Sequence, residues 1–140
     1  MAIEIPSVEA VNEFFAREFP SAHMARHRCV ETGPGFAVAR WQYDPGALRP
    51  GNLISGPTQF AIADLAFWFM TFTVLGLAPM AVTSELYIMF LRPAAGGDLI
   101  ARAELLRAGK TKITGAVKVW VDGAPERPVS HVTGSYVHIK

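Results

Sequence analysis

The sequence predicts an α+β domain in which a curved antiparallel sheet of about five to six strands wraps around one long central helix. Three observations lead to this prediction. The stretch from Ser55 to Leu77 is apolar almost throughout, which indicates a helix buried on all sides. Alternating segments occur before and after it, and short turns rich in glycine and proline separate them, as in antiparallel hairpins. The helical stretches and the strands also occur in separate runs, which favours layers over a repeated strand–helix unit.

A short amphipathic helix is predicted over residues 7–19, with Ser7 as its N-cap and Pro20 at its end. Its apolar residues recur at intervals of three and four, as one helical stripe requires. The stripe comprises Val8, Val11, Phe14, Phe15 and Phe19. Two strands are predicted next, over residues 23–31 and 36–43, and the Gly/Pro turn between them indicates a hairpin.

Residues 44–51 contain two prolines and two glycines and are predicted to form a loop. The central helix then begins with a capping residue at Ser55 or Gly56 and Pro57 in its first turn. Gly76 marks its end. Such a helix would be roughly 30 Å long, which is enough to cross a small domain.

Four further strands are predicted over residues 81–92, 98–108, 110–122 and 128–139. The first is almost wholly apolar at residues 86–91, which suits a central strand covered on both faces. The third alternates most regularly, with its apolar side chains on one face.

The composition indicates one domain, residues 1–140, with extra burial between subunits, because 51% of the chain is hydrophobic and only 18% is charged. A net charge of +1 gives no footprint for nucleic acid. The single cysteine, Cys29, excludes an internal disulfide, and no Cys/His cluster suggests a metal site. The N-terminus has no leader-like pattern, so we expect a cytoplasmic protein.

A membrane-spanning helix is an alternative interpretation of residues 65–82, which are apolar apart from threonines. Pro79, the stop at Gly76 and Asp64 at the edge of the run argue against it, as do the alternating segments on either side. We therefore expect a core helix and no membrane partner.

Asp64 is the only charged side chain between Pro50 and Ser84. It follows Pro57 by seven residues, too far into the helix to serve as a cap. A carboxylate in such surroundings must find hydrogen-bond partners, lose its charge or face a pocket open to solvent and substrate. Asp64 is thus either a structural acid held by neighbouring polar groups or a catalytic carboxylate, and we favour the second.

The order of elements resembles the hotdog fold, and residues 45–138 resemble its PaaI-like acyl-CoA thioesterase branch. The shared pattern is a tight turn, an acid nine residues after the turn begins, an apolar-Arg-Pro motif ending the next strand, and Gly-Asp after it. In this chain these are Ser55-Gly56-Pro57, Asp64, Phe90-Leu91-Arg92-Pro93 and Gly97-Asp98, followed by Gly109-Lys110-Thr111.

The resemblance implies hydrolysis of acyl-CoA thioesters at composite sites between paired subunits, in a dimer or dimer of dimers that needs no cofactor. Asp64 would act as general base or nucleophile, and the N–H of Gly56 would polarise the thioester oxygen. A helix start suits this second role, because it presents free N–H groups and positive potential. Thr83 matches a hydroxyl that can orient the attacking water; the alternative is an ordinary strand residue.

The chain departs from the family pattern in two features, the turn and a position before it. The turn is commonly His-Gly-Gly in the family, whereas this chain has Ser55 in place of the histidine and Pro57 in place of the second glycine. Proline removes one possible N–H donor. The family often has an asparagine six residues before that histidine; Arg49 stands here, with Asn52 three residues later. Asn52 is therefore a candidate helper, and Ser55-Gly56-Pro57 indicates a subgroup.

Arg92, Lys110 and Lys112 could bind the phosphates of CoA, although charges at turns are usually only solvated. Phe67 and Trp68 are candidates for the acyl pocket or, alternatively, simple core residues. The four histidines are scattered along the chain, which disfavours a hydratase or dehydratase that pairs a histidine with an acid. A non-catalytic acyl-CoA-binding protein of the same fold remains the other alternative.

Overall fold

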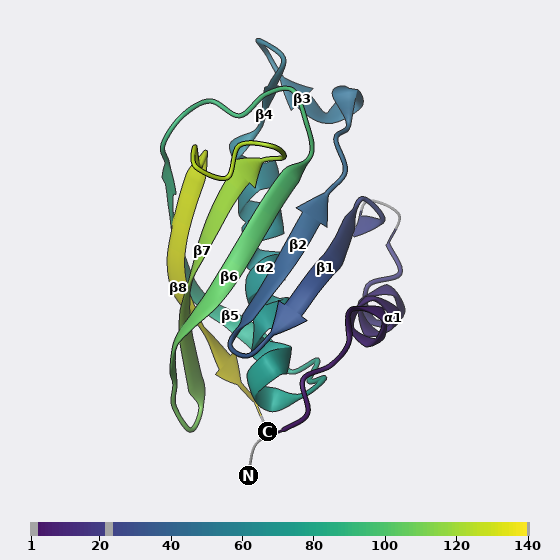
Figure 1. Ribbon diagram of the computed structural model, residues 1–140, viewed down its shortest axis with the longest axis vertical. Helices are drawn as coiled ribbons and strands as arrows, with labels where there is room; N and C mark the ends of the chain where they lie inside the picture. The colour runs from purple at the N-terminus through teal and green to yellow at the C-terminus, as the bar shows by residue number, and fades with distance from the viewer. Residues whose placement is uncertain (1–2, 22–23, 140) are drawn as a thin grey trace.

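Helix α2 (Gly56–Leu75) lies in the hollow of a six-stranded antiparallel sheet, which curves around it (Figure 1). The computed structural model describes residues 3–21 and 24–139. This arrangement is the hotdog fold, and it confirms the predicted α+β class and the long central helix.

The strand order in the sheet is β1-β2-β6-β7-β8-β5, and every neighbouring pair is antiparallel. The six strands are β1 (His27–Gly33), β2 (Phe36–Trp41), β5 (Ala81–Phe90), β6 (Leu99–Ala108), β7 (Lys112–Val121) and β8 (Ser130–His138). The predicted hairpins therefore form, with ends moved by a few residues. The first strand begins at His27, later than predicted, and His23 lies outside the described residues. The predicted loop 44–51 contains the short 3-10 helix η2 (Pro45–Ala47) and strand β3 (Leu48–Arg49), which pairs with β4 (Leu53–Ile54).

Helix α2 begins and ends where its sequence predicts. Ser55 is the N-cap, and its hydroxyl accepts a hydrogen bond of 3.3 Å from the N–H of Thr58. Gly76 ends the helix with a φ of 81°, a conformation that glycine adopts without strain. The helix is long and apolar enough to cross a membrane, yet 67% of its most apolar window is buried inside the fold. That burial is the behaviour predicted for a core helix.

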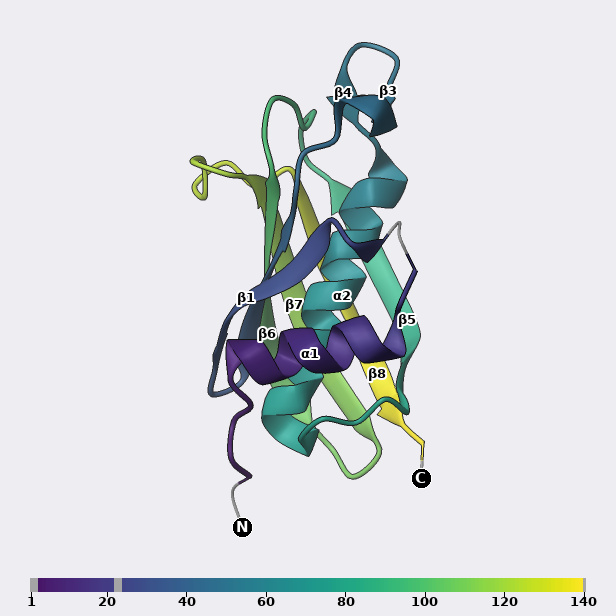
Figure 2. The ribbon, with the colours of Figure 1, turned by 90° about the vertical axis from the view of Figure 1, so that its right-hand side faces the viewer.

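Helix α1 (Val8–Glu18) crosses in front of α2 in Figure 2 and buries Val11, Phe14 and Phe15 of its predicted stripe. Phe19 lies just past the end of the helix and is 44% exposed. Ser7 caps it by accepting from the N–H of Ala10. The two helices meet through aromatic rings, with 5.5 Å between the centroids of Phe14 and Phe72 and 6.3 Å between those of Phe15 and Trp68. Beneath them Cys29 is buried, and this burial raises the pKa of its thiol to about 11.

Strand β5 differs from its prediction. It is an edge strand of the sheet, not a central one, and most of its side chains are exposed in the single chain. A continuous apolar run indicates two covered faces, but it cannot tell whether the cover comes from the same chain. The largest exposures are those of Tyr87 (67%), Met89 (61%) and Phe90 (53%).

Candidate active site

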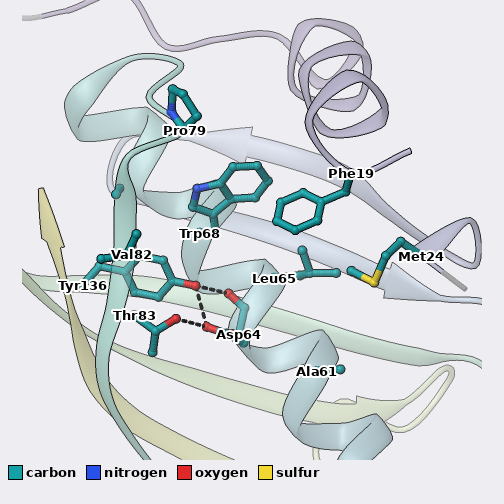
Figure 3. Close-up of a pocket in the computed structure, with 11 residues that line it drawn as sticks. Phe19, Met24, Ala61, Asp64, Leu65, Trp68, Pro79, Val82, Thr83 and Tyr136 are labelled. Carbon is teal, nitrogen blue, oxygen red and sulfur yellow. Dashed lines mark hydrogen bonds between the residues drawn. The ribbon is translucent and has the colours of Figure 1, made fainter. Parts of the chain in front are cut away.

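A cavity of about 330 Å³ opens between the middle of α2 and the start of β5 (Figure 3). Helix α2 contributes one wall, and strands β5 and β8 contribute the opposite one. The end of α1 and the segment after it close one side. The lining residues are Phe19, Met24, Ala61, Asp64, Leu65, Trp68, Pro79, Ala81, Val82, Thr83 and Tyr136. Asp64 is the only charged side chain among these lining residues, so the cavity is apolar with a single carboxylate in its wall.

Two hydroxyl groups hold the Asp64 carboxylate (Figure 3). The hydroxyl of Thr83 donates to Oδ1 over 2.8 Å, and the phenol oxygen of Tyr136 lies 2.5 Å from the same atom. The phenol also lies 2.9 Å from the backbone carbonyl oxygen of Asp64. Asp64 itself is half-buried. It thus has the polar partners that a carboxylate in an apolar helix requires, and it also faces a cavity.

Tyr136 is the site residue that sequence reasoning missed. It lies on β8 with only 4% of its surface exposed, and its ring stacks on that of Phe67 at 4.8 Å. Burial, and then the charge of Asp64, raise the pKa of Tyr136 well above its ordinary value. The phenol therefore stays protonated and remains a hydrogen-bond donor. A buried tyrosine hydroxyl usually needs a partner, which was the one indication available in the sequence.

A bulge in β5 aims Thr83 at Asp64. The pairing of β5 with β8 runs from Thr83↔Tyr136 to Glu85↔Ser135, so Ser84 has no partner on β8. An extra residue reverses which side chains face inward beyond it. Ala81 and Thr83 consequently face α2, whereas Glu85 points elsewhere and contacts Ser135 and Lys112. The pairing Thr83↔Tyr136 also explains why both hydroxyls reach one carboxylate.

A second groove, of about 460 Å³, runs beside the start of α2. Its walls include Gly56, the aromatic ring of Phe90 and the two exposed arginines Arg49 and Arg92. Ser55 caps the N–H of Thr58, and Pro57 has no N–H, so the N–H of Gly56 stays outside the hydrogen bonds of the helix. A Cβ added at Gly56 would lie 3.0 Å from Phe90, which shows how closely the ring covers this backbone.

The two parts of the predicted site do not converge within one chain. Gly56 and Asp64 are eight residues apart on one helix, a separation of about 12 Å along its axis. No described residue lines both the Asp64 cavity and the Gly56 groove. A single thioester carbonyl at Asp64 therefore cannot reach the Gly56 N–H of the same chain.

The remaining predicted residues fall into three groups. Trp68 lines the Asp64 cavity, whereas Phe67 is fully buried behind Tyr136 and does not line it. Asn52 is exposed at the β3–β4 turn with a φ of 59°, so it has a role in the turn itself. Lys110 is exposed in the turn between β6 and β7 and lines neither the cavity nor the groove.

Within the part of the chain that the structure describes, no histidine lines the Asp64 cavity. The same residues include no group of three or more His, Cys, Asp or Glu side chains able to hold a metal ion. The polar side chains that line the described cavity are the carboxylate of Asp64 and the hydroxyls of Thr83 and Tyr136.

The family model for the thioesterase superfamily matches residues 51–126, more than half of the chain. The chain belongs to this superfamily. The match includes Gly56, Asp64 and Thr83, and so both halves of the candidate site. Membership supports thioester hydrolysis as the general class of reaction for this thioesterase-superfamily protein.

Solved structures agree in fold. A candidate thioesterase from Silicibacter sp. TM1040 is 27% identical, covers 98% of this chain and 95% of its own, and has a TM-score of 0.85. The PaaI protein from the phenylacetic acid degradation operon of E. coli is 24% identical, covers 92% and 91%, and has a TM-score of 0.76. Zebrafish thioesterase superfamily member 2 is 16% identical, covers 96% and 99%, and has a TM-score of 0.82. No curated protein sequence matches the chain.

Proposed function

We propose that this protein hydrolyses acyl-CoA thioesters, with Asp64 as general base or nucleophile, at a site completed by a second subunit. One observation carries the proposal: Asp64 is the single charge in the wall of an otherwise uncharged, apolar cavity. An acid placed in this way can act on a neutral acyl group that fills the cavity.

In the general-base route, Asp64 removes a proton from water while the water oxygen bonds to the thioester carbonyl carbon. The carbonyl electrons move onto oxygen, and the tetrahedral intermediate then breaks its C–S bond. The thiolate of CoA leaves and takes up the proton that Asp64 holds. In the nucleophilic route, the carboxylate itself attacks, CoA leaves, and water hydrolyses the resulting anhydride.

The oxyanion that forms in either route needs a hydrogen-bond donor, and we assign this role to the N–H of Gly56 of the partner subunit. The separation of about 12 Å within one helix supports a donor from another chain. The exposed apolar edge of β5 supports a subunit contact beside the cavity, because Val82 lines the cavity and is itself exposed. A helix start is well suited to stabilising developing negative charge.

CoA is assigned to the groove at the helix start, where Arg49 and Arg92 are both exposed. Arginine binds phosphate oxygens through two N–H groups at once. Lys110 lies outside this groove, so we assign phosphate binding to Arg92 and Arg49 and not to Lys110. Trp68, Leu65 and Met24 would then contact the acyl group in the Asp64 cavity.

Two other functions are alternatives on this fold. A hydratase or dehydratase of acyl thioesters would need a base beside the acid, and no described histidine lines this cavity. A non-catalytic acyl-CoA-binding protein differs from a hydrolase only in turnover. The proposed hydrolysis is therefore the function that the arrangement of Asp64, Thr83 and Tyr136 favours.

Release of free thiol from short, medium, long and aryl acyl-CoAs tests the proposal. Because the cavity wall carries a carboxylate and no cation, we expect turnover of neutral acyl groups and poor turnover of acyl groups that end in a carboxylate. Binding of acyl-CoA without thiol release across the whole panel would favour the binding protein and reject hydrolysis.

A further inference from the structure

We propose that Tyr136 is a positioning residue that, together with Thr83, holds one oxygen of Asp64 and leaves the other, Oδ2, as the reactive atom. The kinetic part of this inference rests on the proposed hydrolysis. The placement of the carboxylate is independent of it.

The two oxygens of Asp64 are in different environments. Oδ1 accepts from Thr83 at 2.8 Å and lies 2.5 Å from the phenol oxygen of Tyr136. Among the described residues, no hydrogen bond or ion pair reaches Oδ2. A carboxylate oxygen that already accepts hydrogen bonds is the weaker base and the weaker nucleophile. A water or a thioester in the cavity therefore reacts with Oδ2.

Tyr136 is fixed more firmly than Thr83. Its ring stacks on the fully buried Phe67 with an angle of 12° between the planes, and its hydroxyl also reaches the backbone carbonyl of Asp64 at 2.9 Å. Thr83, in contrast, lies on an exposed edge strand. The phenol therefore sets the orientation of the carboxylate, and it does so from a strand that lies next to β5 in the sheet.

This arrangement fixes the direction of the hydrogen bonds that the Thr83 hydroxyl makes. Its only proton is given to Oδ1, so towards the cavity it can act only as an acceptor. A water that donates one hydrogen to Thr83 and the other to Oδ2 would be held beside the carbonyl carbon. This makes Thr83 a water acceptor and Tyr136 the group that keeps Asp64 in place.

Few other groups can influence Asp64 through charge. From α1 and the segment after it, the lining residues are Phe19 and Met24; from the segment before β5, Pro79. On β5, Glu85 is turned towards Lys112, 3.5 Å from its ammonium group. Tyr136 is the only other titratable side chain among the lining residues, and it stays protonated. Removing its hydroxyl thus removes the contacts of the phenol with Oδ1 and with the backbone carbonyl oxygen of Asp64, and it changes no charge.

The test is Tyr136→Phe, which keeps the stacked ring and removes one oxygen atom. Tyr43→Phe is the matched control, because Tyr43 packs against Trp41 away from the cavity. The infrared difference spectrum between wild type and Asp64→Asn isolates the carboxylate bands of Asp64, whose splitting depends on hydrogen bonding to one oxygen. We expect Tyr136→Phe to shift these bands and Tyr43→Phe to leave them unchanged.

In kinetics, we expect kcat for acyl-CoA hydrolysis to fall by roughly 10- to 100-fold in Tyr136→Phe, the effect of losing a hydrogen bond to a charged group. KM should stay nearly constant. Tyr43→Phe should change none of these.

Unshifted carboxylate bands in folded Tyr136→Phe would overturn the inference, and shifted bands with unchanged kcat would overturn its kinetic part. If wild type releases no thiol from any acyl-CoA, the proposed function fails while shifted bands still support the placement of Asp64. If Tyr136→Phe does not fold, Thr83→Val removes the other donor from Oδ1, and unshifted bands in that variant would contradict the inference equally.

Discussion

The oxyanion donor proposed at Gly56 is a backbone N–H, not a side chain. This N–H lies at the start of α2, free of the helix's own hydrogen bonds, and the ring of Phe90 lies directly above it. Ser55 and Pro57 on either side supply the cap and a residue without an N–H. The chain therefore offers one N–H from this turn to a developing oxyanion, where a second glycine would have offered two.

Replacing Gly56 with proline should remove that donor and lower kcat for acyl-CoA hydrolysis by about 10²-fold or more. Gly56→Ala is the matched control, because it adds the same contact with Phe90 but keeps the N–H. Thiol release should be measured on both variants after circular dichroism shows them folded. Equal activity of the two variants would move the oxyanion role away from Gly56, and the next N–H of this turn, that of Thr58, already donates to Ser55.

The sequence was sufficient to single out Asp64, because no other charge occurs between Pro50 and Ser84. It was not sufficient to find Tyr136, whose contact with Asp64 joins residues 72 positions apart. Such a contact depends on the register of β8 against β5, which no local pattern encodes. Phe67 shows the converse: its apolar surroundings suggested a pocket residue, and the fold places it behind Tyr136.

The contact between α2 and the sheet depends on small residues at the crossing. Gly115 on β7 lies beneath Met70 and Phe67, and a Cβ there would come within 2.8 Å of both the Met70 methyl group and the Glu104 carbonyl oxygen. Helix and strand approach this closely only because the position has no side chain.

Gly115→Ala should therefore destabilise the protein by about 1–3 kcal/mol, the usual effect of overpacking a filled core. Urea denaturation followed by circular dichroism measures it, as a lower midpoint with an unchanged slope. A midpoint equal to that of wild type would mean that α2 can move away from the sheet at no cost, contrary to the packing described above.

The helices and most strands were predictable because each has a local cause. Ser55 and Gly76 bound α2 by their capping chemistry, and alternation at Ile113, Val117 and Val119 defines the inner face of β7. Strand β5 was misplaced in the sheet because its bulge at Ser84 breaks the alternation and its apolar residues lack cover within the chain. Whether a strand lies at the edge or in the centre depends on the assembled sheet, and the local sequence does not determine it.

The exposed edge of β5 affects how the molecule as a whole behaves in solution. Its large apolar side chains include Val82, Tyr87, Met89 and Phe90, and Met80 directly precedes the strand; all are more than a third exposed. An unpaired apolar edge is an open site for association. The Asp64 cavity lies at one end of this edge and the Gly56 groove contacts Phe90 near the other. A second copy that covers β5 could thus complete both halves of the site.

We therefore expect a homodimer, or a dimer of dimers, with an interface above the roughly 1,000 Å² of a stable contact. Light scattering at micromolar concentration measures the assembly. Met89→Lys should weaken it by placing a charge in an apolar contact. A monomeric wild type would contradict the composite site.

The central claim, that Asp64 is the catalytic carboxylate of a thioester hydrolase, is tested most directly by Asp64→Asn. Asparagine keeps the shape and can still accept from Thr83 and Tyr136, but it neither takes a proton nor forms an acyl intermediate. Melting temperature, acyl-CoA binding and thiol release should be measured on the same preparation. We predict a folded protein that binds acyl-CoA while kcat falls by about 10² to 10⁴; thiol release at the wild-type rate would contradict the claim.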